Sequence, residues 1–283
     1  MNAITNLLSA NFYRLARCKL FYVLLAAQAL FEVMLVQSGQ ADLGLTNAGP
    51  DSSMFAYPTW SFLMVSALCG LFLGSGYSSG TFRNQMICGR SRSQIYLANW
   101  ITALFVALCL GLTAELVGAV YGLAAWGPFQ LEGWELAGYF LGTLGTVVAG
   151  ASLAAAFSMS ISNRSAAIVA SLLVFVVLLF LGQIVSVLIA EPPTVPPMEE
   201  VQLGNITMYQ PNYDAPEVPN PSYVGGPLRF PLEVAAYFLP TSQYFQFVNL
   251  AAENPWGLFG LSMLFTALTT AVGLAIFQKK DVK

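Results

Sequence analysis

Six long apolar runs constrain this chain more than any other feature of its sequence. A helix that crosses the roughly 30 Å hydrocarbon core of a bilayer needs about 20 apolar residues, and each run is close to this length or exceeds it. Only 9% of the 283 residues are charged, against about 25% in an ordinary soluble domain. The sequence therefore predicts an all-α integral membrane protein with six transmembrane helices. The predicted spans are Leu20–Val36, Phe55–Gly74, Ile95–Leu116 (or as far as Ala125), Trp134–Phe157, Ala166–Ala190 and Trp256–Phe277.

The positive charges predict the orientation of these spans. Lysine and arginine near the ends of a span resist translocation, whereas acidic residues have little effect. An even number of spans places ten of the eleven basic residues on one face and leaves Arg229 on the other. We therefore predict that both termini are cytoplasmic. The ten basic residues are Arg14, Arg17, Lys19, Arg83, Arg90, Arg92, Arg164, Lys279, Lys280 and Lys283.

Residues 1–19 are predicted to form an amphipathic helix on the cytoplasmic surface of the membrane. An apolar stripe recurs there at helical spacing, at Ile4, Leu7, Leu8, Phe12 and Leu15. Polar residues, Asn11 among them, fall between these positions. We expect the apolar face to lie toward the acyl chains and the polar face toward the headgroups. A frayed tail is the alternative.

The rest of the chain divides into three parts. Residues 20–190 carry the first five spans, with a cytoplasmic loop at about 76–94. Residues 191–255 form an external segment. Eleven of the fifteen prolines of the chain lie in it, between Pro192 and Pro240. So many prolines exclude a regular element, so we expect an extended loop and then short helices, broken at Pro240, that dip into or lie on the outer leaflet. Residues 256–283 are the sixth span and a basic cytoplasmic tail.

The composition excludes several kinds of chemistry. The chain contains no histidine, so the formal G-x-S-x-G match at residues 76–80 lacks the base that a serine hydrolase of this type needs. The four cysteines have no metal-ligand or disulfide spacing, and no G-x-x-x-x-G-K-[ST] loop is present to hold nucleotide phosphates. The net charge of −3 offers no polycationic surface for nucleic acid. We therefore predict no catalytic residue, no metal site, no cofactor on this chain and no nucleic-acid partner.

Two carboxylates lie inside the predicted spans, Glu32 in the outer half of the first span and Glu115 near the outer end of the third. They are too few for an obvious proton relay. Either they reach water or a partner helix near the membrane interface, or they line a substrate path between helices or subunits, which is a speculative role. Glycine pairs spaced by four residues, such as Gly118 and Gly122, favour close helix packing, in a bundle or in a dimer.

The segment between the second and third spans, residues 74–100, reads GSGYSSGTFRNQMICGRSRSQIYLANW. A short, charged elbow of this kind suits the docking of a soluble partner. A solvated loop that follows the positive-inside rule would explain the arginines but not the rest of the string. The strings Gly80–Asn84 and Gly89–Leu97 resemble the corresponding loop of ABC-2-type transporter permeases, in which G-T-x-R-N and G-x-S-R-x-x-x-Y/F recur. The chain start NLLSANFYRLARCKLFYVLL, the string FLPTSQYFQF and the end GLAIFQKKDVK resemble the same family. The external insert of residues 191–227 is longer than this resemblance leads us to expect.

The resemblance implies a permease subunit of a bacterial ATP-binding-cassette exporter in the plasma membrane. Such exporters contain two permease subunits, identical or different, and separate ATPase chains that bind ATP and Mg²⁺. The loop after the second span forms a coupling helix that fits a groove in the ATPase. The residues of this chain that the resemblance places in that element are Thr81, Phe82, Arg83, Asn84, Gly89, Arg90, Ser91 and Arg92.

Three functions remain open at this point. The first is the transport subunit, and the low charge inside the spans favours an amphipathic substrate such as a lipid, a hydrophobic drug or an antimicrobial peptide. The second is a membrane sensor or immunity component that does not transport but recognises an external peptide or lipid. The third, a membrane-embedded enzyme, is disfavoured by the lack of histidine and the shortage of acidic residues in the spans.

Overall fold

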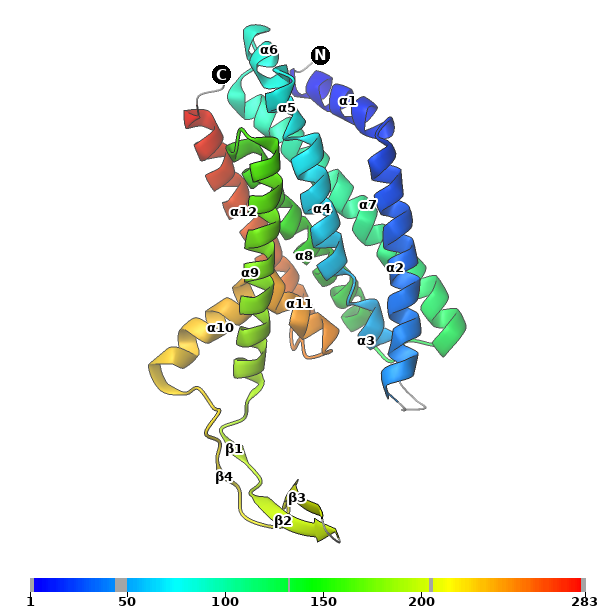
Figure 1. Cartoon of the computed structure of the whole chain (residues 1–283), viewed down its shortest axis with the longest axis vertical. Helices are drawn as coiled ribbons and strands as arrows, with labels where there is room; N and C mark the ends of the chain where they lie inside the picture. The colour runs from blue at the N-terminus through cyan, green and yellow to red at the C-terminus, as the bar shows by residue number, and fades with distance from the viewer. Residues whose placement is uncertain (1–2, 44–49, 132, 204–205, 281–283) are drawn as a thin grey trace.

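The computed structural model describes residues 3–43, 50–131, 133–203 and 206–280. Long helices run side by side to form a bundle, and a segment with two small sheets extends from one end of it (Figure 1). The elements before the sheets are α1 Ala3–Ala16, α2 Lys19–Leu43, α3 Asp51–Met54, α4 Pro58–Phe72, α5 Ser75–Ser78, α6 Thr81–Ile87, α7 Arg92–Trp126, α8 Gly133–Ser160 and α9 Arg164–Ala190. The remaining elements are β1 Thr194–Val195, β2 Met198–Leu203, β3 Ile206–Pro211, β4 Val218–Pro219, η1 Gly226–Leu228, α10 Arg229–Phe238, α11 Pro240–Val248 and α12 Pro255–Lys279.

Six helices in the described residues are long and apolar enough to span a membrane, which confirms that the six predicted runs form helices of suitable length and composition. One difference from the predicted bounds has a structural reason, and the third span agrees with its longer predicted form, to within a residue of Ala125 at its end. The second helix of the six begins at Pro58 instead of Phe55, because proline is tolerated in the first turn of a helix but not in its interior. Helix α7 has 35 residues and is therefore about 52 Å long, so it extends well beyond a 30 Å hydrocarbon core.

Helix α8 lies at the centre of the bundle and packs against α4, α7, α9 and α12. Its small residues make this possible. A Cβ atom added at Gly150 would lie 2.1 Å from the Phe62 ring of α4, and one added at Gly142 would lie 2.3 Å from the Phe247 ring of α11. Gly118 of α7 is in similar contact with Glu32 of α2. These glycines therefore serve close packing inside one chain.

Helices α1 and α6 and the C-terminal end of α12 lie together at one end of the bundle (Figure 1). We call this the basic end, because the basic residues of the described chain gather in these elements and their neighbours, while Arg229 begins α10 at a distance. The single ion pair found among the described residues joins Arg229 to Glu233. Within the described chain, the positive charges of the basic end therefore have no carboxylate partner.

Helix α1 is present, but the expected division of its faces is wrong. Leu7, Asn11 and Leu15 are all buried, and the Asn11 amide donates to Asn99 Oδ1 at 3.1 Å and to Thr102 Oγ1 at 3.2 Å, both in α7. Three residues spaced by four lie on one face of a helix. This face packs on α7 instead of facing lipid. Asn11 can be buried there because Asn99 and Thr102 of α7 accept the hydrogen bonds of its amide.

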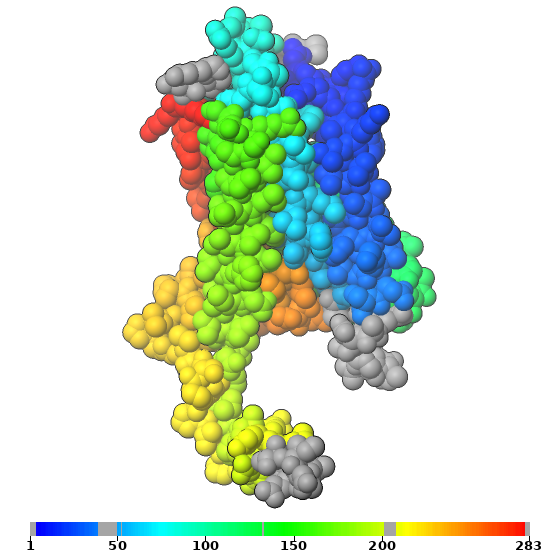
Figure 2. Space-filling model, in the orientation of Figure 1, coloured from blue at the N-terminus to red at the C-terminus, as the bar shows by residue number. Residues whose placement is uncertain are grey.

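The segment of residues 191–255, which the sequence predicts to be external, contains regular structure that the proline count did not predict. Strands β2 and β3 pair antiparallel, with Met198 opposite Pro211, and β1 pairs with β4. Between Pro197 and Pro211 there is no proline, so the backbone N–H groups needed for a ladder are available there. Figure 2 shows that this sheet-bearing segment stands apart from the helical bundle.

Helices α10 and α11 are separated at Leu239 and Pro240, and α11 packs against α8 and α9. The Thr241 hydroxyl donates to the Leu178 carbonyl of α9 at 2.7 Å. Leu178 precedes the end of α9 at Ala190 by twelve residues, which is about 18 Å along the helix. The start of α11 therefore lies deep beside α9 and not at its end.

Candidate functional site

The elbow between α4 and α7 is built from two short helices, α5 and α6, at the basic end (Figure 1). Gly80 precedes α6 with φ +66°, and Gly89 follows it with φ +80°. Both values lie in the left-handed region that glycine adopts without steric cost. The two glycines of the predicted coupling motif thus form the sharp turns that make α6 a separate projecting helix.

Phe82 attaches this elbow to the bundle. Its side chain is buried, and its ring lies 4.9 Å from the Tyr77 ring and 6.1 Å from the Phe277 ring of α12, both in edge-to-face geometry. The Cβ position of Gly76 lies only 2.4 Å from the same ring. Among the residues predicted to couple to an ATPase, Phe82 is therefore an internal anchor and has no surface to offer a partner.

The arginines of the elbow have different environments. Arg83 and Asn84 are exposed and Arg90 is half-buried. Arg92 Nη1, by contrast, donates to the Gln278 carbonyl at 2.8 Å and also to the Lys280 carbonyl. Positive charge at a helix C-terminus is favourable, because the last carbonyls have no partner inside the helix. Arg92 therefore ties the start of α7 to the end of α12.

The remaining motif residues form local structure. The Ser91 hydroxyl accepts a hydrogen bond from the Gln94 N–H, and the Gln94 side chain accepts one from the Ser91 N–H, which is a capping box that starts α7. The Thr81 and Ser79 hydroxyls lie 2.6 Å apart. Ile87 is not among the predicted residues, yet its side chain is 73% exposed at the end of α6. An apolar residue inside a polar loop was the signal that could have found it.

Lys280 links the same region to α8. Its ammonium group donates to the Ser160 carbonyl at 2.6 Å and lies 4.2 Å from the centre of the Tyr77 ring. Partial burial lowers the pKa of this group below its ordinary value. The ends of α8 and α12 and the elbow are therefore joined at the basic end.

The second predicted site is a buried polar cluster inside the bundle. Glu115 of α7 accepts hydrogen bonds at Oε1 from the Tyr57 hydroxyl at 2.8 Å and from the Thr143 hydroxyl of α8 at 3.3 Å. Glu32 of α2 is fully buried, and its carboxylate lies against Gly118 of α7, three residues after Glu115 on the same helix. The fold thus brings together two carboxylates from different helices, buried inside one subunit and not at its surface.

Glu32 differs from Glu115 in its partners. Neither carboxylate oxygen of Glu32 has a hydrogen-bond partner among the described residues. One turn earlier on α2, Gln28 Oε1 accepts a hydrogen bond from the Ser61 hydroxyl at 3.1 Å. The amide nitrogen of Gln28 has no hydrogen-bond partner among the described residues. Buried polar groups usually have partners, so this cluster is under-satisfied. The substrate-path role of Glu32 and Glu115 stays a prediction.

Glu115 should stabilise the bundle mainly by accepting the hydrogen bond from the Tyr57 hydroxyl. Glu115→Leu leaves the buried Tyr57 hydroxyl without its acceptor, which should lower the free energy of unfolding by about 1 to 3 kcal/mol, whereas the Thr143 hydroxyl keeps the Tyr139 and Phe140 carbonyls of its own helix. Glu115→Gln keeps an acceptor oxygen and should cost less. Thermal unfolding of both variants in the same detergent measures the difference. Equal stability of the two variants would show that the hydrogen bonds to Glu115 do not matter.

No group of three or more histidine, cysteine, aspartate or glutamate side chains that suits a metal ion occurs in the described residues. No protein-family model matches the chain, and no curated protein matches it either.

Proposed function

We propose that this chain is the permease subunit of an ATP-binding-cassette exporter. The observation that carries the proposal is α6, a short helix with exposed Arg83 that projects from the basic end between two spanning helices. The resemblance of this segment to the coupling loop of ABC-2-type permeases supports the same function. Arginine is enriched at protein interfaces, and exposed Ile87 adds an apolar contact beside the charges.

The anchoring of the elbow supports a mechanical role. A push on α6 acts on α12 through Phe82 and Phe277, and α12 is joined to α7 by Arg92 and to α8 by Lys280. A rigid connection of this kind can convert closure of an ATPase pair into tilting of the spans. ATP and Mg²⁺ belong to the partner ATPase in this proposal, and this chain supplies the path and the lever.

The proposal includes the cellular setting. The chain lies in the bacterial plasma membrane with both termini and the elbow in the cytoplasm, as the positive-inside rule favours. A second permease subunit, the same or a related chain, completes the path. Charge inside the spans is sparse, which favours an amphipathic substrate. The two carboxylates that lie within the predicted spans, Glu32 and Glu115, are both buried.

Co-purification tests this function directly. A tagged copy of the chain, extracted from its native membrane in mild detergent, should retain a soluble protein with a nucleotide-binding loop, identified by mass spectrometry. Its ATPase activity should rise when the two are reconstituted together in vesicles. Recovery of the chain with no ATPase at any detergent concentration would reject the exporter proposal.

The sheet-bearing segment favours the second candidate, a sensor or immunity component. Strands β2 and β3 project from the bundle, and Met198 and Tyr209 expose about two thirds of their surface. A two-stranded hairpin is marginally stable alone, so an external peptide or lipid that packs on it would stabilise it. This candidate predicts ligand binding to the hairpin without transport.

A further inference from the structure

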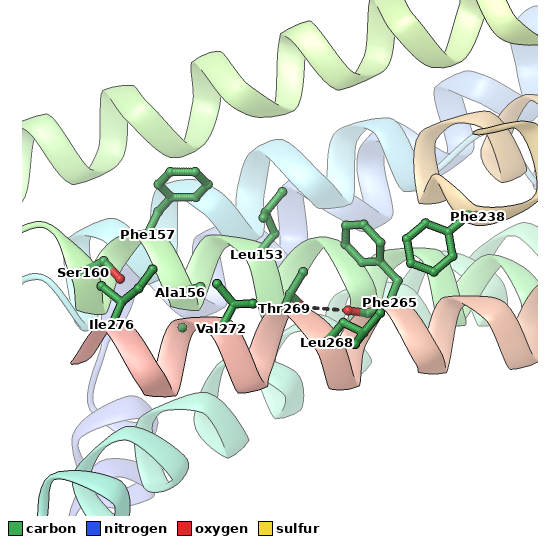
Figure 3. Close-up of a pocket in the computed structure, with 11 residues that line it drawn as sticks. Leu153, Ala156, Phe157, Ser160, Phe238, Phe265, Leu268, Thr269, Val272 and Ile276 are labelled. Atoms are coloured by element: carbon green, nitrogen blue, oxygen red, sulfur yellow. Dashed lines mark hydrogen bonds between the residues drawn. The ribbon is translucent and has the colours of Figure 1, made fainter. Parts of the chain in front are cut away.

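An apolar groove runs along the shared face of α8 and α12. It has a volume of about 290 Å³ and is lined by α8 residues such as Phe157 and α12 residues such as Leu268, Val272 and Ile276. Thr269 also lines it, but its hydroxyl donates to the Phe265 carbonyl of its own helix at 2.9 Å. Figure 3 shows these side chains along one side of the two helices. The lining of the groove is therefore apolar along its length.

The two ends of the groove differ. At one end Phe238 of α10 packs against Phe265, with ring centres 5.6 Å apart, and closes the groove (Figure 3). At the other end lie Ser160 and Ile276. The Lys280 ammonium group is bonded to the Ser160 carbonyl, while the Ser160 hydroxyl is buried and has no partner among the described residues. The groove is thus closed and apolar at one end and positively charged at the other.

The dimensions match one leaflet of a bilayer. From Phe265 to Ile276, α12 advances eleven residues, which is about 16 Å. Half of a 30 Å hydrocarbon core is about 15 Å. One acyl chain therefore fits along the groove, with its headgroup beside Lys279 and Lys280. Lys279 is exposed and follows Ile276 by three residues, on the same helix face.

We propose that this groove binds one anionic phospholipid from the leaflet at the basic end. An acyl chain lies between α8 and α12, the Ser160 hydroxyl donates to an ester or phosphate oxygen, and Lys279 and Lys280 attract the negative headgroup. Basic side chains at a membrane surface favour anionic lipids in this way. The absence of a carboxylate partner for these lysines in the described chain leaves their charge available. The proposal does not depend on the exporter function.

The experiment measures lipid binding to the purified chain in detergent by native mass spectrometry, with dioleoylphosphatidylglycerol and dioleoylphosphatidylcholine as probes. The wild-type chain should bind one phosphatidylglycerol several-fold more tightly than phosphatidylcholine. Val272→Trp fills the groove and should abolish this site. Val169→Trp is the matched control, because Val169 on α9 is equally exposed, at 62% against 59% for Val272, and lies outside the groove.

The headgroup is tested separately. Lys279→Gln combined with Lys280→Gln should weaken phosphatidylglycerol binding by about fivefold or more and leave phosphatidylcholine binding unchanged, whereas Lys19→Gln should have no effect. Equal binding of both lipids by the wild-type chain would overturn the anionic preference. Tight phosphatidylglycerol binding by Val272→Trp, at the level of Val169→Trp, would overturn the groove as the site, and this comparison remains decisive if the lysine variant fails to fold.

Discussion

If the proposed exporter function is right, replacing Arg83 and Arg90 together by glutamate should remove the proposed ATPase partner from the chain and abolish ATP-dependent export. Contacts to charged groups at an interface contribute about 1 to 3 kcal/mol each. Their loss and reversal should therefore weaken association by at least about 30-fold. The fold should survive, because Arg83 is exposed and the anchor of the elbow is the buried ring of Phe82. Co-purification and transport in vesicles measure the two effects.

Lys19→Glu provides the control for this double reversal. Lys19 also lies at the basic end, where α2 begins, so its reversal changes the charge of the same end, by half as much as the double variant, without altering the elbow. It should leave ATPase retention unchanged. If the reversed elbow retains its ATPase at wild-type stoichiometry and still exports, the coupling role of α6 is wrong and the arginines are a solvated loop.

The sequence predicted the spanning helices well because hydrophobic length is a local property. Each run needs no partner to be recognised, and six such helices are present in the described residues. The bounds were less predictable where another element decides them. Helix α7 continues to Trp126, which is ten residues, or about 15 Å, beyond the shorter predicted end at Leu116. In this extension the Tyr121 hydroxyl donates to Gln37 Oε1 of α2, so a contact far away along the chain supports the added length.

Burial of polar residues could not be predicted from the sequence, because it depends on partners far away along the chain. Asn11 is buried since Asn99 and Thr102 of α7 bond its amide. Glu32 and Glu115 come together only when α2 and α7 pack side by side. A single sequence gives the polarity of each residue but not which helix faces it.

The position of the elbow in the chain was predicted from the sequence, but the structural roles of its residues were not, and its coupling to an ATPase stays a prediction. The glycines and the exposed Arg83 agree with a projecting elbow. Phe82 and Arg92 instead attach the elbow to α12. The motif string does not distinguish a residue that touches a partner from one that holds the element in place, because both kinds lie a few positions apart on one short helix and its flanks.

Replacing Gly182 of α9 by leucine should strongly destabilise the bundle. A Cβ atom there would lie 2.7 Å from the Thr241 backbone carbon and 2.9 Å from the Ser242 backbone nitrogen. Backbone atoms cannot turn aside as a side chain does, so α11 must move and the hydrogen bond from Thr241 to Leu178 is lost. Overpacking costs about 1 to 3 kcal/mol and the hydrogen bond about 1 kcal/mol. The thermal midpoint in detergent should fall by roughly 5 to 15 °C.

Gly260→Leu is the matched control for Gly182→Leu. Gly260 lies in α12, and a Cβ atom added there would meet no atom within 4 Å. Leucine is a better helix former than glycine by nearly 1 kcal/mol, so this variant should unfold at the wild-type temperature or slightly above it. The same substitution in two spanning helices therefore separates close backbone contact from any general effect of a larger side chain. Equal midpoints for the two variants would show that α11 does not pack on α9 at Gly182.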